Sequence, residues 1–304
     1  MESSTPRHAR IVHLSDLHFP LRDPVPLRAL LGKRALGWAN LRLRRAAVHS
    51  LEVAEALLES AAREEADLVL ITGDFVNLAL AGELRRASRI LQGSGLDPGR
   101  TMLLPGNHDR YTPLADLAGA YERAMSDWLP LGFDRSGGYP LLRALGPVSV
   151  LGLDTATWRG PLRAAGRLDR MQLERLAEAL ASPSLERRHP VIAMHHPPFR
   201  LRGAAARDWR NGLEGRERLR AVLRGRSCTL LHGHLHRAAR REEGRMEIVG
   251  APSASSDTAD SSTRAAYHLY TFDREGLCEA VAITLAADGS GFVRAPLVNR
   301  ALDV

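Results

Sequence analysis

Short apolar runs that alternate with helical patterns constrain the fold of this chain more than any other feature. Residues 10–14, 67–71 and 101–104 are rich in Val, Ile, Leu or Met and are bounded by Gly, Asp or Asn, which is typical of buried strands. The intervening residues 46–63 and 82–91 have the composition or the three-and-four spacing of helices. The order strand, helix, strand, helix, strand predicts a parallel sheet with right-handed crossovers.

The rest of the chain continues this pattern and then changes. Strands are predicted at 148–153, 191–194 and 228–231, and helices at 170–181 and 214–223. The end of the chain is strand-rich, at 246–249, 265–272 and 279–285, which predicts an antiparallel second sheet. Because no repeat, linker or break in composition divides the 304 residues, we predict a single layered domain over 1–304.

Composition excludes several classes of protein. With 44% hydrophobic and 25% charged residues the chain is close to the globular average, which excludes disordered and fibrous classes. Its apolar runs are far shorter than the roughly 20 residues of a membrane-spanning helix, and residues 1–10 lack the apolar core of a secretory signal. We therefore predict a cytoplasmic protein. Cys228 and Cys278 are too few for a disulfide framework and are expected to be buried thiols.

Potential metal ligands directly follow five of the predicted strands. They are Asp16 and His18, Asp74, Asn107, His195, and His234 with His236. Because the carboxyl ends of parallel strands face one crevice, we expect these side chains to meet. The i, i+2 spacing in Asp-Leu-His and His-Leu-His suits an extended backbone. Gly73, Gly106 and Gly233 each precede a ligand and suit tight turns with positive φ.

The number and type of these donors predict a pair of metal ions. Three oxygen donors and four imidazoles exceed what one cation takes from a protein, so two cations that share a bridging carboxylate are expected. Nitrogen and oxygen ligands without thiolate favour Mn, Fe, Zn or Co.

Taken in this order, the five motifs resemble those of the calcineurin-like metallophosphoesterase superfamily over residues 11 to about 236. The resemblance implies an α/β fold, a four-layer α/β/β/α sandwich of two mixed sheets flanked by helices. It implies two divalent transition metal ions, with Mn favoured and Asp74 as the bridge. One ion is then held by Asp16, His18, Asp74 and His236, and the other by Asp74, Asn107, His195 and His234. His196 is expected outside the ligand set.

The resemblance also implies hydrolysis of a phosphodiester or pyrophosphate by a metal-bridging hydroxide that attacks phosphorus in line. The expected catalytic residues are His108, which stabilises charge or protonates the leaving oxygen, and Asp109, which positions the loop. In the phosphoprotein phosphatase branch an Asp orients this histidine, whereas this chain has Asn77 at that place. The difference argues against a phosphoprotein substrate.

Two segments hold the positive excess behind the formal net charge of +7. Residues 21–49 contain seven Lys or Arg against one acidic residue, and residues 200–226 contain nine Arg against three. Both begin just after predicted ligands, which places them on the rim of the crevice. We interpret 21–49 as a cationic, cap-like insertion that selects a nucleotide or nucleotide-linked lipid, or that lies peripherally on the anionic inner membrane face. The alternative is that Trp38 and the leucines pack on the core while the arginines are solvated.

The second basic segment supplies the candidate substrate-binding residues. These are Arg207, Trp209, Arg210 and Asn211, for which a plain surface loop is the alternative. A weaker resemblance to the UDP-2,3-diacylglucosamine pyrophosphatases of lipid A synthesis points to a lipid-linked substrate. The best-known branch of that family has Arg where this chain has His108.

Other functions stay open on the sequence. A 3′,5′-cyclic-nucleotide phosphodiesterase is the nearest alternative because such enzymes have the same length and motif set. Nucleic acid is disfavoured as a partner because the positive charge is confined to two segments and only 5% of the residues are aromatic. A non-catalytic metal-binding scaffold is disfavoured because every expected ligand and His108 are present.

Overall fold

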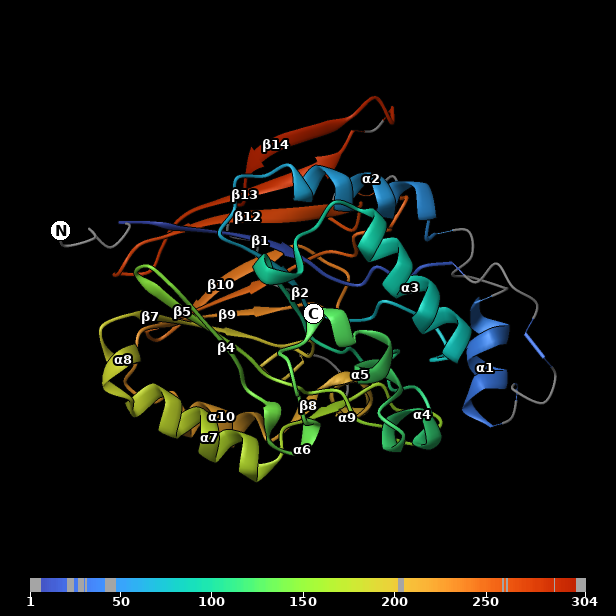
Figure 1. Cartoon of the computed structure of the whole chain (residues 1–304), viewed down its shortest axis with the longest axis horizontal. Helices are drawn as coiled ribbons and strands as arrows, with labels where there is room; N and C mark the ends of the chain where they lie inside the picture. The colour runs from blue at the N-terminus through green and yellow to red at the C-terminus, as the bar shows by residue number, and fades with distance from the viewer. Residues whose placement is uncertain are drawn as a thin grey trace.

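The computed structural model describes residues 7–20, 25, 26, 30, 32–41, 48–201, 205–258, 260, 262–286 and 288–298. Two six-stranded sheets dominate this part of the chain (Figure 1). The first has the order β14-β13-β12-β1-β2-β3, and the second has the order β10-β11-β9-β7-β5-β4.

The first sheet joins the two ends of the described chain. Its parallel strands are β1 (Ala9–Leu14), β2 (Leu68–Ile71) and β3 (Thr101–Leu103), which confirms the predicted parallel start. Antiparallel strands β12 (Ala266–Phe272), β13 (Leu277–Leu285) and β14 (Phe292–Pro296) follow on the other side of β1. The prediction that the end of the chain forms a second sheet of its own is therefore wrong. Strand β1 pairs with β2 along one edge and with β12 along the other, which joins the last strands to the first sheet.

The second sheet has a parallel centre and antiparallel edges. Its parallel strands are β5 (Val148–Gly152), β7 (His189–Ala193), β9 (Cys228–His232) and β11 (Met246–Gly250). The edges are β4 (Leu141–Leu145) and β10 (Ala239–Glu243), and a separate parallel pair consists of β6 (Gly166–Arg167) and β8 (Leu213–Glu214). Sequence patterns missed β4, β10 and β14 because these edge strands are partly exposed and lack an apolar run.

Alternate residues of the strands face different layers. In β1, Ile11 belongs to the apolar core between the two sheets, while Val12 and Leu14 pack in the cluster that also holds the buried side chains of α2 (Leu51–Ala62) and α3 (Ala81–Gly93). Helices α7 (Arg170–Ala181) and α10 (Arg216–Val222) cover the outer face of the second sheet. Figure 1 shows the two pairs of helices on opposite sides. The layers are those of the expected α/β/β/α sandwich.

Local capping fixes where helices begin. The helix predicted at 46–63 begins later, at Leu51, because Ser50 Oγ accepts a hydrogen bond from the Val53 N–H and His49 forms a β-bridge with Ser256. Helix α7 spans the predicted residues and is capped by Asp169. The shorter helices are α1 (Lys33–Asn40), α4 (Pro113–Leu117), α5 (Ala120–Ala124), α6 (Arg135–Gly138), α8 (Pro183–Glu186) and α9 (Ala205–Asn211).

The structure bears on two expectations, that both cysteines are buried and that the apolar runs are too short for a membrane-spanning helix. Cys228 is buried as predicted, but Cys278 is exposed because β13 turns this position to solvent. Of the helices in the described ranges, none has the length and apolar character needed to cross a membrane.

Candidate metal centre

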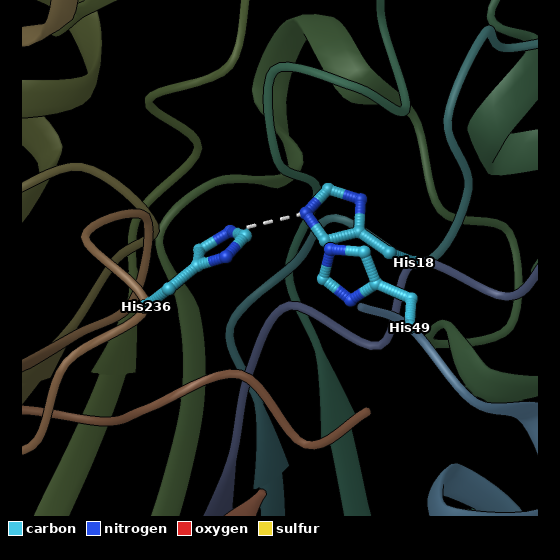
Figure 2. A group of neighbouring side chains, drawn as sticks. All are labelled: His18, His49 and His236. Carbon is cyan, nitrogen blue, oxygen red and sulfur yellow. Dashed lines mark hydrogen bonds between the residues drawn. The ribbon is translucent and has the colours of Figure 1, made fainter. Parts of the chain in front are cut away.

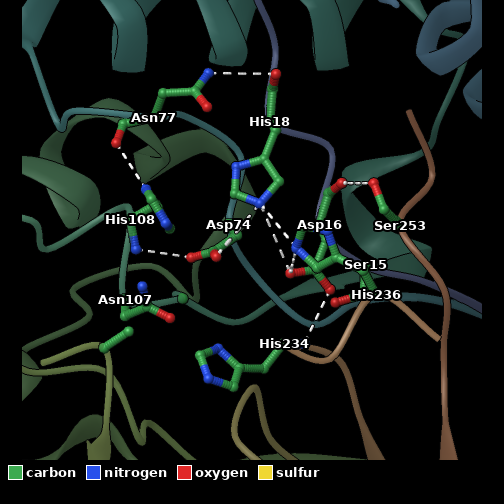
Figure 3. A network of polar contacts seen from close by, with 12 residues as sticks. Ser15, Asp16, His18, Asp74, Asn77, Asn107, His108, His234, His236 and Ser253 are labelled. Atoms are coloured by element: carbon green, nitrogen blue, oxygen red, sulfur yellow. Dashed lines mark hydrogen bonds and ion pairs between the residues drawn. The ribbon is translucent and has the colours of Figure 1, made fainter. Parts of the chain in front are cut away.

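Seven candidate ligands come together where five strands end, and all of them but His195 are labelled in Figure 3. Strands β1, β2 and β3 of the first sheet lead into Asp16, His18, Asp74 and Asn107, and strands β7 and β9 of the second lead into His195, His234 and His236. Backbone hydrogen bonds hold these loops together, from Asp16 N to Gly73 O and from Gly233 N to His195 O. The centre therefore lies at the common edge of both sheets.

The first group of donors surrounds Asp16. His236 Nε2 lies 3.2 Å from Asp16 Oδ1 and 3.2 Å from His18 Nε2. His18 Nε2 in turn lies 3.6 Å from Asp74 Oδ2. The four residues assigned to the first cation thus share one small space.

The second group surrounds His195. Its Nε2 lies 3.4 Å from Asp74 Oδ2, 3.2 Å from Asn107 Oδ1 and 3.3 Å from His234 Nδ1. Asp74 Oδ2 is therefore close to the imidazoles of both groups. This is the position that a bridging carboxylate requires.

The hydrogen bonds of the imidazoles fit metal ligation. His195 Nδ1 lies 2.6 Å from the Thr72 carbonyl and His18 Nδ1 lies 3.3 Å from the Val76 carbonyl. A carbonyl only accepts, so each Nδ1 donates and each Nε2 is the nitrogen left to bind a cation, in place of any proton that it carries. Among the described residues, the buried Asp16 Oδ1 accepts no well-aligned hydrogen bond. Carboxylate oxygens and imidazole Nε2 atoms that face one another in a buried site need a positive charge between them, either a proton or a metal ion.

The charges of the site also favour cations. Burial raises the pKa of Asp16, but the adjacent His236 outweighs this and lowers it to about 2. Burial lowers the pKa of His195, but Asp74 outweighs this and raises it to about 9. Burial, with a contribution from His195, lowers the pKa of His234 to about 3. Burial raises the pKa of Asp74, but the neighbouring histidines, His195 first, outweigh this and lower it well below its usual value. Asp16 and Asp74 are therefore ionised at neutral pH while His234 is neutral, and the two carboxylates attract positive charge.

Backbone strain is concentrated at the ligands. Five of the six non-glycine residues with positive φ in the described chain are candidate ligands, namely Asp16, His18, Asp74, His234 and His236, with φ between 40° and 70°. The predicted extended backbone in Asp-Leu-His and His-Leu-His is therefore wrong, since both ends of each motif are left-handed. Non-glycine residues adopt this conformation at a cost that is typical of functional sites.

The glycines before the ligands serve two purposes. Gly73 has φ +96°, as predicted. Gly106 and Gly233 do not have positive φ, so that part of the prediction is wrong. They are needed for close approach instead, because a Cβ at Gly106 would collide with Asp74 Oδ1 and a Cβ at Gly233 would collide with Ser15 Oγ.

His108 lies beside the bridging carboxylate. Its backbone N–H donates to Asp74 Oδ1 over 2.7 Å, and its Nδ1 donates to the Asn77 carbonyl over 2.7 Å. Its ring stacks on Tyr111 with 5.1 Å between centroids. The Asn77 main chain therefore orients His108, while the Asn77 amide donates to the Phe19 carbonyl over 3.0 Å.

Asp109 makes the contacts of a positioning residue. The buried carboxylate accepts hydrogen bonds from the backbone N–H groups of Asp74, Phe75 and Gly106 over 2.8 to 2.9 Å. It thereby joins the loop after β2 to the loop after β3. Burial and the charge of Asp74 raise the pKa of Asp109 to about 8.

Two further histidines adjoin the centre. His49, which the sequence patterns missed, has its ring 4.8 Å from that of His18 and 5.7 Å from that of His236 (Figure 2). It follows no predicted strand, so no pattern marked it. His196 lies close to His195 and His234, but its Nδ1 meets Thr155 Oγ1 and its Nε2 meets the Ala164 carbonyl, and its place outside the ligand set stays a prediction.

A cavity of about 410 Å³ adjoins His108 and Asn107. Of the four predicted substrate-binding residues, Arg210 and Asn211 line it. Trp209 lines a second cavity of about 650 Å³, where the guanidinium of Arg163 lies 4.7 Å from its ring centroid. Arg207 lines neither of these two cavities and is exposed on α9, because the helix turns it to solvent.

The first basic segment is described only in part. Arg22, Arg28, Arg42, Arg44 and Arg45 lie outside the described residues. Lys33 and Arg34 lie on α1, where Trp38 packs against the small apolar cluster around Leu78. The role of 21–49 as a cap or membrane contact stays a prediction.

Solved structures with a similar fold include two proteins that are named as phosphatases. A dimetal phosphatase from zebrafish (Danio rerio) is 14% identical and has a TM-score of 0.61, with 95% of this chain and 99% of that chain covered. A purple acid phosphatase from yellow lupin (Lupinus luteus) seeds is 12% identical and has a TM-score of 0.58, with 94% of this chain and 53% of that chain covered. A comparison with curated proteins finds no match.

The family follows from the sequence match over most of the chain. The model of the calcineurin-like phosphoesterase family matches residues 9–238, which contain all seven candidate ligands and His108. The chain therefore belongs to the calcineurin-like phosphoesterase family.

Proposed function

We propose that the protein is a dinuclear metal-dependent phosphoesterase that hydrolyses a phosphodiester or pyrophosphate bond. The observation that carries this proposal is the position of Asp74 Oδ2, 3.6 Å from His18 Nε2 and 3.4 Å from His195 Nε2. When bound, two divalent cations supply the Lewis acidity that activates water and neutralises the charge of a phosphoryl group. Mn²⁺ is the favoured ion, and Fe, Zn and Co suit the same donors.

The residues beside the centre supply the other parts of the reaction. His108 Nδ1 donates to a carbonyl, so Nε2 is the nitrogen left to face the substrate, and in the imidazolium form it donates to an oxygen of the substrate or leaving group. Asp109 holds the loops that carry Asp74 and His108. Arg210 and Asn211 contact the part of the substrate that occupies the adjoining cavity.

The first experiment compares hydrolysis of bis-p-nitrophenyl phosphate and p-nitrophenyl phosphate with added Mn²⁺. We expect a preference for the diester, no activity in Asp74→Ala, and a loss of about 10²- to 10⁴-fold in His108→Ala because a proton donor is removed. His189→Gln is the matched control, since His189 is a buried histidine that bonds Thr229 away from the centre.

The outcomes separate the alternatives. A preference for the monoester identifies a phosphatase and contradicts the proposed bond type. Full metal content without activity on either compound favours the non-catalytic scaffold. Absence of bound metal in the wild-type protein contradicts the dinuclear centre itself.

A further inference from the structure

Lys33 is the only lysine in the chain, and it lines the cavity beside His108. It lies at the start of α1, in the described part of the first basic segment. The sequence analysis considered this segment only as a whole and assigned no separate role to Lys33. The contacts of its side chain indicate a specific role.

Two contacts hold the Lys33 ammonium at the cavity wall. Nζ donates to the Arg163 carbonyl over 2.8 Å and lies 4.6 Å from the centroid of the Tyr111 ring. Tyr111 stacks on His108, so the ring joins the lysine to the residue beside the metal centre. An ammonium has three N–H donors, and the Arg163 carbonyl accepts one of them.

The cavity is cationic, in contrast to the acidic centre next to it. Lys33, Arg163 and Arg210 line it, and no Asp or Glu occurs among its lining residues in the described chain. Arg163 donates to Glu214 over 2.7 Å, but Glu214 does not line this cavity. Burial lowers the pKa of Lys33 to about 8, against the attraction of Asp74. A half-buried ammonium in a cavity that no carboxylate lines needs an anion from another source.

We infer that Lys33 binds the second phosphoryl group of a pyrophosphate substrate while the reacting phosphoryl group lies at the metal centre. This inference rests on the proposed function and chooses between its two bond types. Asn107 and His108 line the same cavity as Lys33, so the wall that holds the ammonium continues up to the metal centre. The remaining wall, with Leu41, Pro161 and Leu162, suits the organic group on the second phosphate.

The reaction consumes one water and needs no other reactant. The water oxygen forms a bond to the phosphorus at the metal centre, and the bond from that phosphorus to the bridging oxygen breaks. Two separate phosphates result, each keeping any organic group that it carried, and the two protons of the water pass to the products or to solvent. The leaving phosphate gains negative charge as the bond breaks, and the Lys33 ammonium stabilises that charge.

Because Lys33 is the only lysine, its amine can be followed by mass spectrometry. The protein with excess Mn²⁺ is labelled with trinitrobenzenesulfonate, and the peptide carrying Lys33 is quantified apart from the N-terminal amine. The probes are methylenediphosphonate, which has two phosphoryl groups and cannot be hydrolysed, and inorganic phosphate, which has one. We expect methylenediphosphonate to slow labelling of Lys33 at least fivefold, and phosphate at the same concentration to slow it less than twofold.

Two variants distinguish binding from a tether for α1. Lys33→Met is expected to weaken binding of methylenediphosphonate at least tenfold by calorimetry, with wild-type metal content. Arg34→Met is the matched control on the same helix, because Arg34 donates to the Leu78 and Ala79 carbonyls and does not line the cavity. The control should bind the probe as the wild type does.

Three results overturn the inference. They are equal protection by the two probes, no protection by either, and the same loss of binding in Lys33→Met and Arg34→Met. If the wild-type protein still binds Mn²⁺ and hydrolyses bis-p-nitrophenyl phosphate, only the Lys33 subsite has failed. If it does neither, the proposed function has failed.

Discussion

Two buried histidines lie opposite each other on neighbouring strands and share one tyrosine. His13 of β1 pairs with His268 of β12, and the two Nδ1 atoms lie 3.3 Å and 2.9 Å from Tyr270 Oη. Burial lowers the pKa of His268 from 6.5 to about 4. The unfolded chain therefore takes up this proton first as the pH falls. The stability that His268 contributes is complete above pH 6.5 and is lost as the pH falls towards 4.

The resulting prediction concerns stability in acid. Between pH 7.5 and 5, we expect His268 alone to account for a loss of about 2 kcal/mol in the free energy of unfolding. Replacement by Gln should remove this part of the pH dependence, as measured by urea unfolding of the metal-free protein at both pH values. His8→Gln, at an exposed position, should leave the wild-type dependence intact. An equal pH dependence in His268→Gln and wild type would contradict the assignment.

The position of a single residue could be predicted where a motif follows a strand. Asp16, Asp74 and His195 come directly after apolar runs, so the order of the strands predicted that these side chains lie close together. His49 and Lys33 follow no such run, and only the folded chain brings them to the centre and its cavity. The sequence did not show that Arg207 lies away from both cavities, because the direction of a side chain on a short helix depends on how that helix packs, and its role in binding stays a prediction.

At the scale of elements, the loops after the strands determine the geometry of the centre. The loop after β9 passes so close to the loop after β1 that only glycine fits at position 233. His234 N–H then donates to Asp16 Oδ2 over 2.9 Å, which fixes one ligand by means of another.

Gly233→Ala tests this packing. The added Cβ would displace Ser15 and Asp16, so we expect Mn²⁺ to bind at least tenfold more weakly. Gly82→Ala is the control, because Gly82 lies in α3 with nothing within 4 Å of the added Cβ. That variant should keep its metal affinity and gain about 0.5 to 1 kcal/mol of stability from helix propensity. If Gly233→Ala bound Mn²⁺ with the affinity of the wild type, the loops would have to move to accommodate the added Cβ, and the prediction would be wrong.

The sequence predicted whether a segment forms a strand or a helix more reliably than it predicted which strands pair. Apolar runs predicted β2 and β9, and the composition of residues 170–181 predicted α7. The pairing of β12 with β1 was not visible, because nothing local in a strand states which sheet edge it will join. The positive φ of the candidate ligands could not be predicted from the sequence either, since Asp and His adopt the left-handed conformation only where surrounding contacts impose it.

At the scale of the whole molecule, the centre joins the two sheets. Each cation that binds only the folded protein stabilises it by about 2.7 kcal/mol at a concentration of 100 times its Kd. For a chain of this length we expect Tm to rise by about 4 °C for each Mn²⁺ ion bound, hence by about 8 °C for two, and to fall again with EDTA. Differential scanning calorimetry measures the shift, and Asp74→Ala should abolish it. A Tm that does not respond to Mn²⁺ in the wild type would contradict a folded-state site.

Because the ligands are divided between two sheets, a complete set of donors exists only after both sheets have folded and packed together. The loops at 16–18, 74 and 107 belong to one half of the sandwich, and those at 195 and 234–236 belong to the other. A nascent chain or a proteolytic fragment that has completed one half offers an incomplete set of donors to either cation. If the proposed function holds, metal binding and hydrolysis then require the whole sandwich, and a copy that loses its fold loses both.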